Sequence, residues 1–350
     1  MSRALIQRLY DAHAFDAMLL DVDMRDYHVP FDDLTNQATT ESSLRDAVAK
    51  SERVALTGVS GSGKSSVARY ALDPPPQGIA PIWVPVAYKD DDVATDPRKF
   101  AQYLVDVIST AAVAANRIPR KTREAILAGT TDDINLPTVA RKHGLGLTIK
   151  HWILQGTVAR DVTKTVEGGK VRRSEQDVLE RANDVLEAIK AHGLFPVLVM
   201  DDTDRLVGRS DPDRMIPAFF GSVLRAAIDN LHAGIVVAVQ PFYLARDDYK
   251  RCANGLIERH IQIPEIPDVD GMAAILTARV KFANRRRTAA DVFADGALEE
   301  LYEVYRSLEE RSVRRLLSTA HAALGRSQAT VADAITVEHV QAGADDALLT

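Results

Sequence analysis

Apolar residues follow two different spacings along this chain, and their alternation predicts an α/β fold. Apolar runs bounded by turn residues predict buried strands, and they lie at residues 54–57, 82–86, 195–200 and 234–239. A fifth short strand is predicted at residues 259–264, where apolar and polar residues are mixed. Between these runs, apolar residues recur every three or four positions, which is typical of helices. Strands that alternate with helices favour a parallel sheet sandwiched by helices.

The pattern changes after Pro267. Four segments with helical spacing follow, with no strand pattern among them, at residues 271–282, 297–305, 312–324 and 336–342. We therefore expect an α/β core over residues 35–266 and an all-helical lid domain over residues 267–350. Residues 1–34 form a helical lead-in, which we expect to pack on the main domain or on a neighbouring molecule.

The region from about residue 110 to residue 190 has helical parts at each end but no sustained period between them. We interpret it as an insertion in the core. Two interpretations stay open for it, a long connection that packs on the core and a module that binds a partner.

A glycine-rich segment directly follows the first predicted strand. Residues 58–65 have the sequence GVSGSGKS, which matches G-x-x-x-x-G-K-S, and a predicted helix begins immediately after them. A strand, this loop and a helix together are the context of a phosphate-binding P-loop. The sequence therefore predicts a nucleotide triphosphate site.

The chemistry of phosphate binding explains these residue types. Gly61 and Gly63 let backbone N–H groups converge on an anion, and the helix N-terminus attracts negative charge. Lys64 reaches the β- and γ-phosphates, and the Ser65 hydroxyl ligates Mg²⁺. The residues expected to bind ATP are Gly58, Ser60, Gly61, Ser62, Gly63, Lys64, Ser65 and Ser66.

A second motif ends the third predicted strand, where Val197–Met200 precede Asp201 and Asp202. Apolar residues followed by paired acids form a Walker B pattern, in which carboxylates lie at the carboxyl edge of a parallel sheet. We expect Asp201 to hold Mg²⁺ and Asp202 to orient or deprotonate the attacking water.

Composition limits the kind of protein. The 350 residues carry a net charge of −6, which does not favour a protein that coats nucleic acid. Cys252 is the only cysteine, so no internal disulfide can form, and a reducing cytoplasm is favoured. The first residues do not resemble a signal peptide. No apolar run is long enough to cross a bilayer, so we expect no membrane partner.

The order of these motifs resembles that of AAA+ P-loop ATPases, in particular the initiator-like and STAND-like branches of bacteria and archaea. Residues 201–206 (DDTDRL) are similar to the Walker B run of that family, residues 255–264 to its arginine-finger segment, and residues 312–317 (SVRRLL) to its sensor-2 helix. The resemblance covers roughly residues 35–345, and residues 110–190 match poorly.

The resemblance implies roles for three further residues. Gln240 corresponds to sensor 1 near the γ-phosphate, and Arg314 to the sensor-2 arginine, with Arg315 as its alternative. Arg259 corresponds to an arginine finger that acts on the nucleotide of a neighbouring subunit. A homo-oligomer with ATP sites at subunit interfaces and a protein partner are therefore expected. Simple alternatives are that Gln240 caps a strand, Arg259 forms a surface ion pair and Arg314 is solvated.

Three departures from the family pattern bear on function. Asp202 stands where these ATPases usually have glutamate, which predicts slow hydrolysis and favours nucleotide as a switch. Gln240 replaces the more usual Asn, Ser or Thr at sensor 1. Replication initiators add a winged-helix DNA-binding domain after the lid, and this chain ends at Thr350, so we do not expect a stand-alone origin binder.

Other functions remain open. One alternative is a nucleotide-gated regulator of DNA transposition or phage defence, and a second is a small-molecule P-loop kinase. A motor would turn over quickly, whereas a switch would bind tightly and hydrolyse slowly. Arg285–Arg287 with Lys281, and separately residues 120–123, could contact nucleic-acid phosphates or form solvated faces. Their spacing does not decide between these.

Overall fold

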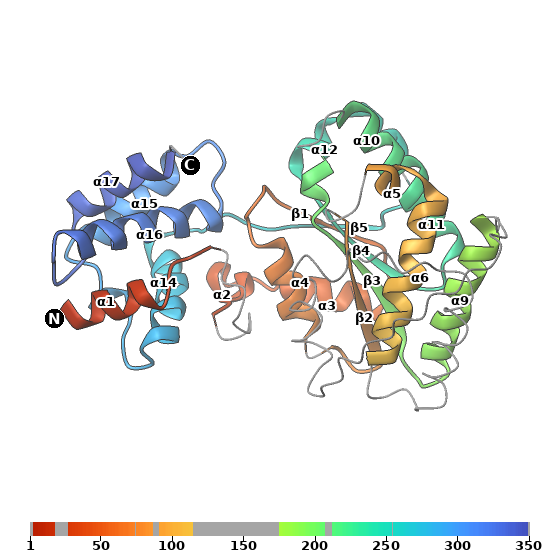
Figure 1. Cartoon of the computed structure of the whole chain (residues 1–350), viewed down its shortest axis with the longest axis horizontal. Helices are drawn as coiled ribbons and strands as arrows, with labels where there is room; N and C mark the ends of the chain where they lie inside the picture. Colours follow the sequence, from red (N-terminus) through yellow and green to blue (C-terminus); the bar gives the residue numbers. More distant parts are fainter. Residues whose placement is uncertain are drawn as a thin grey trace, which may run out of the picture. The chain divides into compact units, whose positions relative to one another are not determined.

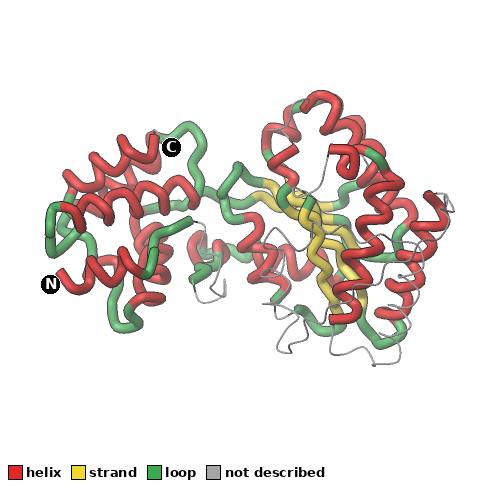
Figure 2. The backbone as a smooth tube through the Cα atoms, in the orientation of Figure 1, coloured by secondary structure: helices red, strands yellow, loops and turns green. Residues whose placement is uncertain are grey.

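The computed structural model of the protein describes residues 3–17, 27–73, 75–86, 91–114, 175–206, 212–253 and 255–348. As predicted, a five-stranded parallel sheet is flanked by helices, and further helices follow it in the chain (Figure 2). The strands are β1 (Val54–Thr57), β2 (Ile79–Pro85), β3 (Phe195–Asp201), β4 (Gly234–Val239) and β5 (Arg259–Gln262).

The strand order is β2-β3-β4-β1-β5. β2 contains Pro81 and Pro85 and lies at an edge of the sheet, where a missing backbone donor is tolerated. β3 pairs in parallel with β2 and with β4, so that Val199 lies opposite Trp83 on one side and Val236 on the other. Every residue of β1 and β4 is buried. Strands that are covered on both faces have near-continuous apolar sequences, which explains the runs seen in the sequence.

Helices lie close to where periodicity placed them. Those that accompany the sheet are α2 (Phe31–Thr35), α3 (Glu41–Ala49), α4 (Lys64–Leu72), α5 (Asp91–Thr95), α6 (Pro97–Ala114), α9 (Glu175–Lys190), α10 (Pro212–Ala218), α11 (Leu224–Asn230), α12 (Pro241–Ala245) and α13 (Asp247–Ala253). The others are α1 (Arg3–Asp11), α14 (Val269–Ala283), α15 (Ala297–Ser307), α16 (Val313–Ala329) and α17 (Val337–Leu348). Within the described part of the chain, no helix is long and apolar enough to span a membrane.

The helical segment from Pro212 to Asn230 contains an irregular turn. A π-helical turn at Phe219–Val223 separates α10 from α11, directly after Pro217. Proline lacks the N–H that an α-helix needs, and such a turn rearranges the hydrogen bonds that follow. Of the predicted insertion, α9 is observed, while residues 115–174 lie outside the described residues.

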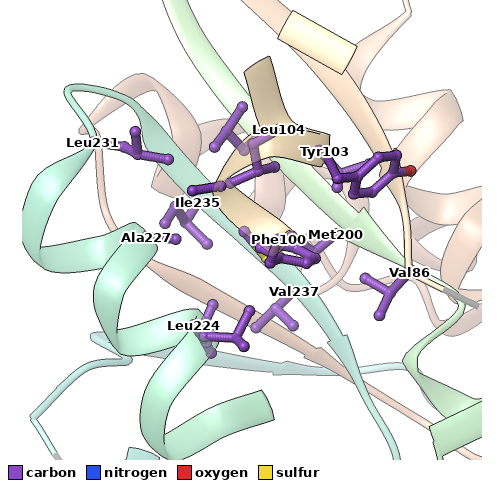
Figure 3. Packing of buried hydrophobic residues seen from close by; sticks show 14 of the residues in the cluster. Val86, Phe100, Tyr103, Leu104, Met200, Leu224, Ala227, Leu231, Ile235 and Val237 are labelled. Atoms are coloured by element: carbon purple, nitrogen blue, oxygen red, sulfur yellow. The ribbon is translucent and has the colours of Figure 1, made fainter. Parts of the chain in front are cut away.

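The chain forms two compact units. One combines residues 45–55 with residues 72–260, and its core contains residues of α6, α9, α11, β3 and β4. Figure 3 shows side chains of α6 and α11 packed against those of β3 and β4. Phe100, Met200, Leu224 and Val237 lie in that core and are each at most 2% exposed. α6 and α9 lie side by side in this unit (Figure 1).

The other unit combines residues 1–44, residues 56–71 and residues 261–350, and so contains the P-loop together with α14–α17. Helix α1 belongs to its core. Leu5, Ile6, Leu9 and Phe15 are buried in one apolar cluster with the C-terminal helices, and α1 lies against α14 and α16 (Figure 1). The lead-in therefore packs on the C-terminal helices, which the sequence did not indicate. The domain boundaries at residues 34 and 266 stay predictions.

Candidate functional site

The glycine-rich loop between β1 and α4 has a backbone that suits an anion. Gly61 and Gly63 have φ angles of 76° and 105°, in the left-handed region that glycine adopts without the steric cost of a Cβ. Ser62 N donates to the Val59 carbonyl at 3.1 Å and closes a turn. The loop then enters α4, whose first N–H groups lack partners within the helix and attract anions.

Lys64 is the first residue of α4, and its side chain reaches back to the loop. Its Nζ donates to the carbonyl oxygens of Gly58 at 2.8 Å and of Val59 at 3.0 Å. Lys64 is only 6% exposed, and a buried ammonium needs such acceptors because its desolvation is costly. The loop thus already holds a cation, and phosphate oxygens are acceptors of the same kind.

Ser62 presents a buried hydroxyl that lacks a partner. Its Oγ makes no hydrogen bond to the part of the chain that the structure describes. A Cβ at Gly58 would overlap this oxygen, so only glycine permits the close approach. An unsatisfied buried hydroxyl costs about 1–3 kcal/mol, and a phosphate oxygen is an acceptor that would satisfy it. Ser65 and Ser66 lie half-buried on the first turn of α4.

The N-terminus of α16 touches the loop through Arg314. The Arg314 backbone N donates to the Gly61 carbonyl at 3.0 Å, and Nη1 lies 3.3 Å from Ser60 Oγ. A Cβ at Gly61 would overlap the Arg314 side chain. Ser312 caps the helix by accepting a hydrogen bond from Arg315 N at 3.2 Å. Of the two arginines considered from the sequence, Arg314 is therefore the one whose side chain bonds the loop.

Sequence reasoning missed a segment that lies beside the P-loop. The Phe31 ring would be 3.5 Å from a Cβ at Gly63, and the rings of His28 and Tyr70 have centroids 4.7 Å apart. Tyr70 belongs to α4. Residues 27–42 thus form a wall beside the loop and its helix.

Carboxylates hold this wall in shape. Glu41, which is 1% exposed, accepts hydrogen bonds from the backbone N of Phe31 and of Asp32. Asp32 in turn accepts from the backbone N of Thr40 at 2.8 Å and of Ser42 at 2.7 Å. Partial burial raises the pKa of Asp32, but these hydrogen bonds outweigh it and lower the pKa. In the sequence, the only sign of such a loop is that acidic residues lie among serines and threonines, whose side chains readily bond nearby backbone groups.

The Walker B residues lie in the other unit, at the end of β3. Asp201 is the last residue of the strand, and its Oδ1 accepts a hydrogen bond from Asp202 N at 2.9 Å. Asp202 has a φ of 61°. Residues other than glycine adopt this left-handed conformation at a cost, and strained residues of this kind cluster at functional sites.

Two residues that sequence reasoning missed link this turn to the end of β4. Thr203 is fully buried, and its hydroxyl donates to the Ala238 carbonyl. The hydroxyl of the buried Tyr243 donates to the Thr203 carbonyl at 2.7 Å. Gln240, between β4 and α12, occupies the N-cap position of α12. The turn after Asp202 and the segment that carries Gln240 are thus held together.

Arg259 lies at the start of β5, paired with an acid of its own chain. Its Nε is 2.7 Å from Glu52 Oε2, and the two side chains are 31% and 26% exposed. Beside it, Arg53 pairs with Glu258 at 2.8 Å, which lowers the pKa of Glu258. Arg259 N also donates to the Arg53 carbonyl. The structure therefore places the predicted finger in a partly exposed network of two ion pairs.

The residues expected to hold a metal are few. Among the described residues, no three His, Cys, Asp or Glu side chains are grouped so that they could hold a metal ion. Ser65 and Asp201 supply a hydroxyl and a carboxylate, which are oxygen donors suited to Mg²⁺. Mg²⁺ at nucleotide sites takes most of its ligands from water and phosphate, so few protein donors are needed.

Comparison with known proteins identifies the fold. The structure is similar to the ORC1 protein of Aeropyrum pernix in complex with DNA, with a TM-score of 0.52, 13% identity and coverage of 95% of this chain and 69% of that one. The ADP form of Aeropyrum pernix ORC2 matches with a TM-score of 0.52, 12% identity and coverage of 93% and 73%. This chain shares its fold with these ORC proteins. No protein-family model and no curated protein matches its sequence.

A eukaryotic structure has the same fold. Drosophila ORC bound to DNA matches with a TM-score of 0.52 and 13% identity, and the match covers 99% of this chain and 66% of that one. Because the similar structures come from Aeropyrum pernix and from Drosophila, the shared fold does not restrict this chain to bacteria or archaea.

Proposed function

We propose that this protein is a Mg²⁺-dependent ATPase of the AAA+ type that works as an oligomer and couples its nucleotide state to assembly or to a protein partner. The conformation of the P-loop carries this proposal. Gly61 and Gly63 are left-handed, Lys64 is buried against the loop carbonyls, and Arg314 reaches the loop from α16.

The loop residues bind the phosphates. Lys64 exchanges its bonds to the Gly58 and Val59 carbonyls for bonds to phosphate oxygens, and the buried Ser62 hydroxyl gains the acceptor that it lacks. Arg314, which contacts Ser60 and Gly61 of the loop, adds a guanidinium that stabilises charge on the terminal phosphate. Magnesium, held by Ser65 and Asp201, would neutralise charge on the phosphates.

Asp202 orients the attacking water and accepts its proton. Its left-handed backbone is maintained by the Thr203 and Tyr243 contacts, which also connect it to Gln240. Gln240 acts at sensor 1. Since aspartate is one methylene shorter than glutamate, we expect turnover to be slow. This favours a nucleotide-gated switch as the second candidate function, one that shares every binding residue but releases product rarely.

The first experiment compares ATP binding and turnover in three variants. Lys64→Ala removes the ammonium at the loop, and ATP affinity should fall by at least tenfold, because hydrogen bonds to charged groups contribute about 1.5–3 kcal/mol. Asp202→Asn should bind ATP as the wild type does and lose turnover. Lys50→Ala, which changes an exposed lysine outside the loop, is the control.

Unchanged ATP affinity in Lys64→Ala would contradict the assignment of the P-loop as the ATP site. Normal hydrolysis in Asp202→Asn would show that another residue activates the water. Tight binding with hardly any turnover in the wild type would establish the switch in place of the motor. Phosphate transfer to a small acceptor would identify a kinase.

A further inference from the structure

The turn after α14 displays positive charge that the proposed ATP site does not use. Lys281 and Phe282 lie in the last turn of the helix, and Arg285 and Arg286 follow it, all of them exposed. Phe282 is 41% exposed, and among the described residues few other large apolar side chains are exposed. We call these four residues the basic tip.

The charges of the basic tip have no carboxylate partner in the part of the chain that the structure describes. Within the described residues, no acid lies within 4.0 Å of the Lys281, Arg285 or Arg286 side chain. Asp291 is the nearest acid in sequence, and it is already occupied by Arg287 at 2.9 Å and by Thr288. Arginines elsewhere that pair with acids include Arg53, Arg246, Arg259, Arg306, Arg311 and Arg326.

The turn itself is held firmly. Asn284 Oδ1 accepts a hydrogen bond from Arg286 N at 3.2 Å, and the Asn284 carbonyl accepts from Arg287 N at 3.0 Å. Ala289 N donates to Thr277 Oγ1 at 3.0 Å, which fastens the end of the turn to α14. Guanidinium groups on an ordered turn lose less backbone freedom on binding than groups on a loose segment do.

We infer that the basic tip, with Arg285, Arg286 and Lys281 beside the exposed Phe282 ring, binds single-stranded nucleic acid through its phosphates and one stacked base. Arginine and lysine neutralise phosphates, and an exposed aromatic ring offers a stacking surface to any unpaired base. A duplex hides its base faces, so it would engage only the charges. An acidic protein surface would leave the role of Phe282 unexplained.

Binding of a fluorescent oligo-dT to the full-length protein, followed by anisotropy over a range of salt concentrations, tests this inference. Arg285→Glu with Arg286→Glu should weaken binding by at least tenfold. It should also flatten the plot of log affinity against log salt, by about 0.7 for each phosphate that the variant no longer neutralises. Arg8→Glu with Arg251→Glu changes the net charge equally at two separate exposed positions and should leave binding nearly unchanged.

Phe282→Ala separates stacking from charge. It should weaken oligo-dT binding about fivefold or more, since one stacked base contributes about 1–3 kcal/mol, and leave binding to a duplex of the same length unchanged. Lys64→Ala should bind oligo-dT normally, so failure of the ATP site and failure of this inference are distinguishable. The inference is wrong if the wild type does not bind oligo-dT at low salt, or if the two double variants weaken binding equally. Equal effects of Phe282→Ala on both nucleic acids would overturn the single-strand preference.

Discussion

Gly61 meets two requirements at once. Its φ of 76° suits glycine, and the space where a Cβ would stand is filled by Arg314. The loop conformation and the position of α16 therefore depend on the same missing side chain. At Gly63 the φ of 105° is equally unusual, but a Cβ there would meet only the Phe31 ring at 3.5 Å, which is an ordinary contact.

This difference predicts coupling between Gly61 and Arg314. Gly61→Ala should cost about 1–2 kcal/mol for the left-handed backbone and more for the overlap with Arg314. Arg314→Gly removes the overlap, so the double variant should be more stable than the sum of the single changes by about 0.5–3 kcal/mol. Urea unfolding measures all three. Gly63→Ala with Arg314→Gly is the control and should be additive; additivity in both pairs would exclude the close contact in solution.

His321 makes the stability of the helical unit depend on pH. Its ring stacks against Tyr10 and His13, with centroids 6.3 and 6.2 Å away, and its buried Nδ1 has no hydrogen bond among the described residues. Burial lowers the pKa of His321 below its ordinary value of 6.5; Asp16 opposes this effect and His13 adds to it. The folded protein thus favours the neutral ring, whereas the unfolded chain takes up a proton more readily.

The free energy of unfolding should therefore keep its full contribution from neutral His321 above pH 6.5 and fall as the pH drops below 6.5. The reason is that His321 binds a proton more strongly in the unfolded chain than in the folded protein. Thermal unfolding on both sides of pH 6.5 should show this loss. His321→Gln should make the curve flatter, while His260→Gln, at an exposed histidine, should not. A wild-type melting temperature that does not change with pH in this range would contradict the inference that the folded protein favours a neutral His321 ring.

At the scale of elements, α1 shows what periodicity can and cannot predict. Leu5 and Leu9 indicated one apolar face, and both are buried. The surface that they cover could not be predicted, since any apolar groove satisfies the same spacing. Gly325 lies below the Tyr10 ring, and Gln328 Nε2 donates to Gln7 Oε1 at 3.3 Å, so polar and small residues of α16 complete the contact.

Removing one apolar side chain from α1 should destabilise the C-terminal helices. Leu9 is fully buried, so Leu9→Ala should cost about 2–5 kcal/mol. Arg8→Ala, at the neighbouring exposed position, should stay within about 0.5 kcal/mol. Urea unfolding compares the two. If Leu9→Ala is as stable as Arg8→Ala, then α1 is not docked on these helices in solution.

For the whole molecule, the open question is whether subunits complete each other's sites. Arg259 is paired with Glu52 of its own chain, so action on a neighbour requires this partly exposed pair to open. An exposed pair contributes only about 0–1 kcal/mol, which an assembly contact can offset. The pair is therefore compatible with an arginine that acts between subunits and with one that has a structural role.

Turnover per subunit as a function of protein concentration should distinguish these roles. It should rise with concentration in the wild type and stay low and flat in Arg259→Ala. Arg53→Ala, which breaks the neighbouring pair with Glu258, is the matched control and should keep the rise. Glu52→Gln should keep it too, because it frees Arg259. Constant turnover per subunit, unchanged in Arg259→Ala, would mean that each chain works alone.

The strands, most helices and the P-loop could be predicted from the sequence, because they depend on local spacing and on residue types that few other structures require. The P-loop glycines and the apolar run that ends in Asp201 and Asp202 can each be recognised from a few neighbouring residues. The partners became known only from the folded chain: Arg314 on Gly61, Glu52 on Arg259, Phe31 beside Gly63 and α1 on α16. Each joins residues far apart in the chain, and such contacts depend on packing and charge that spacing does not encode.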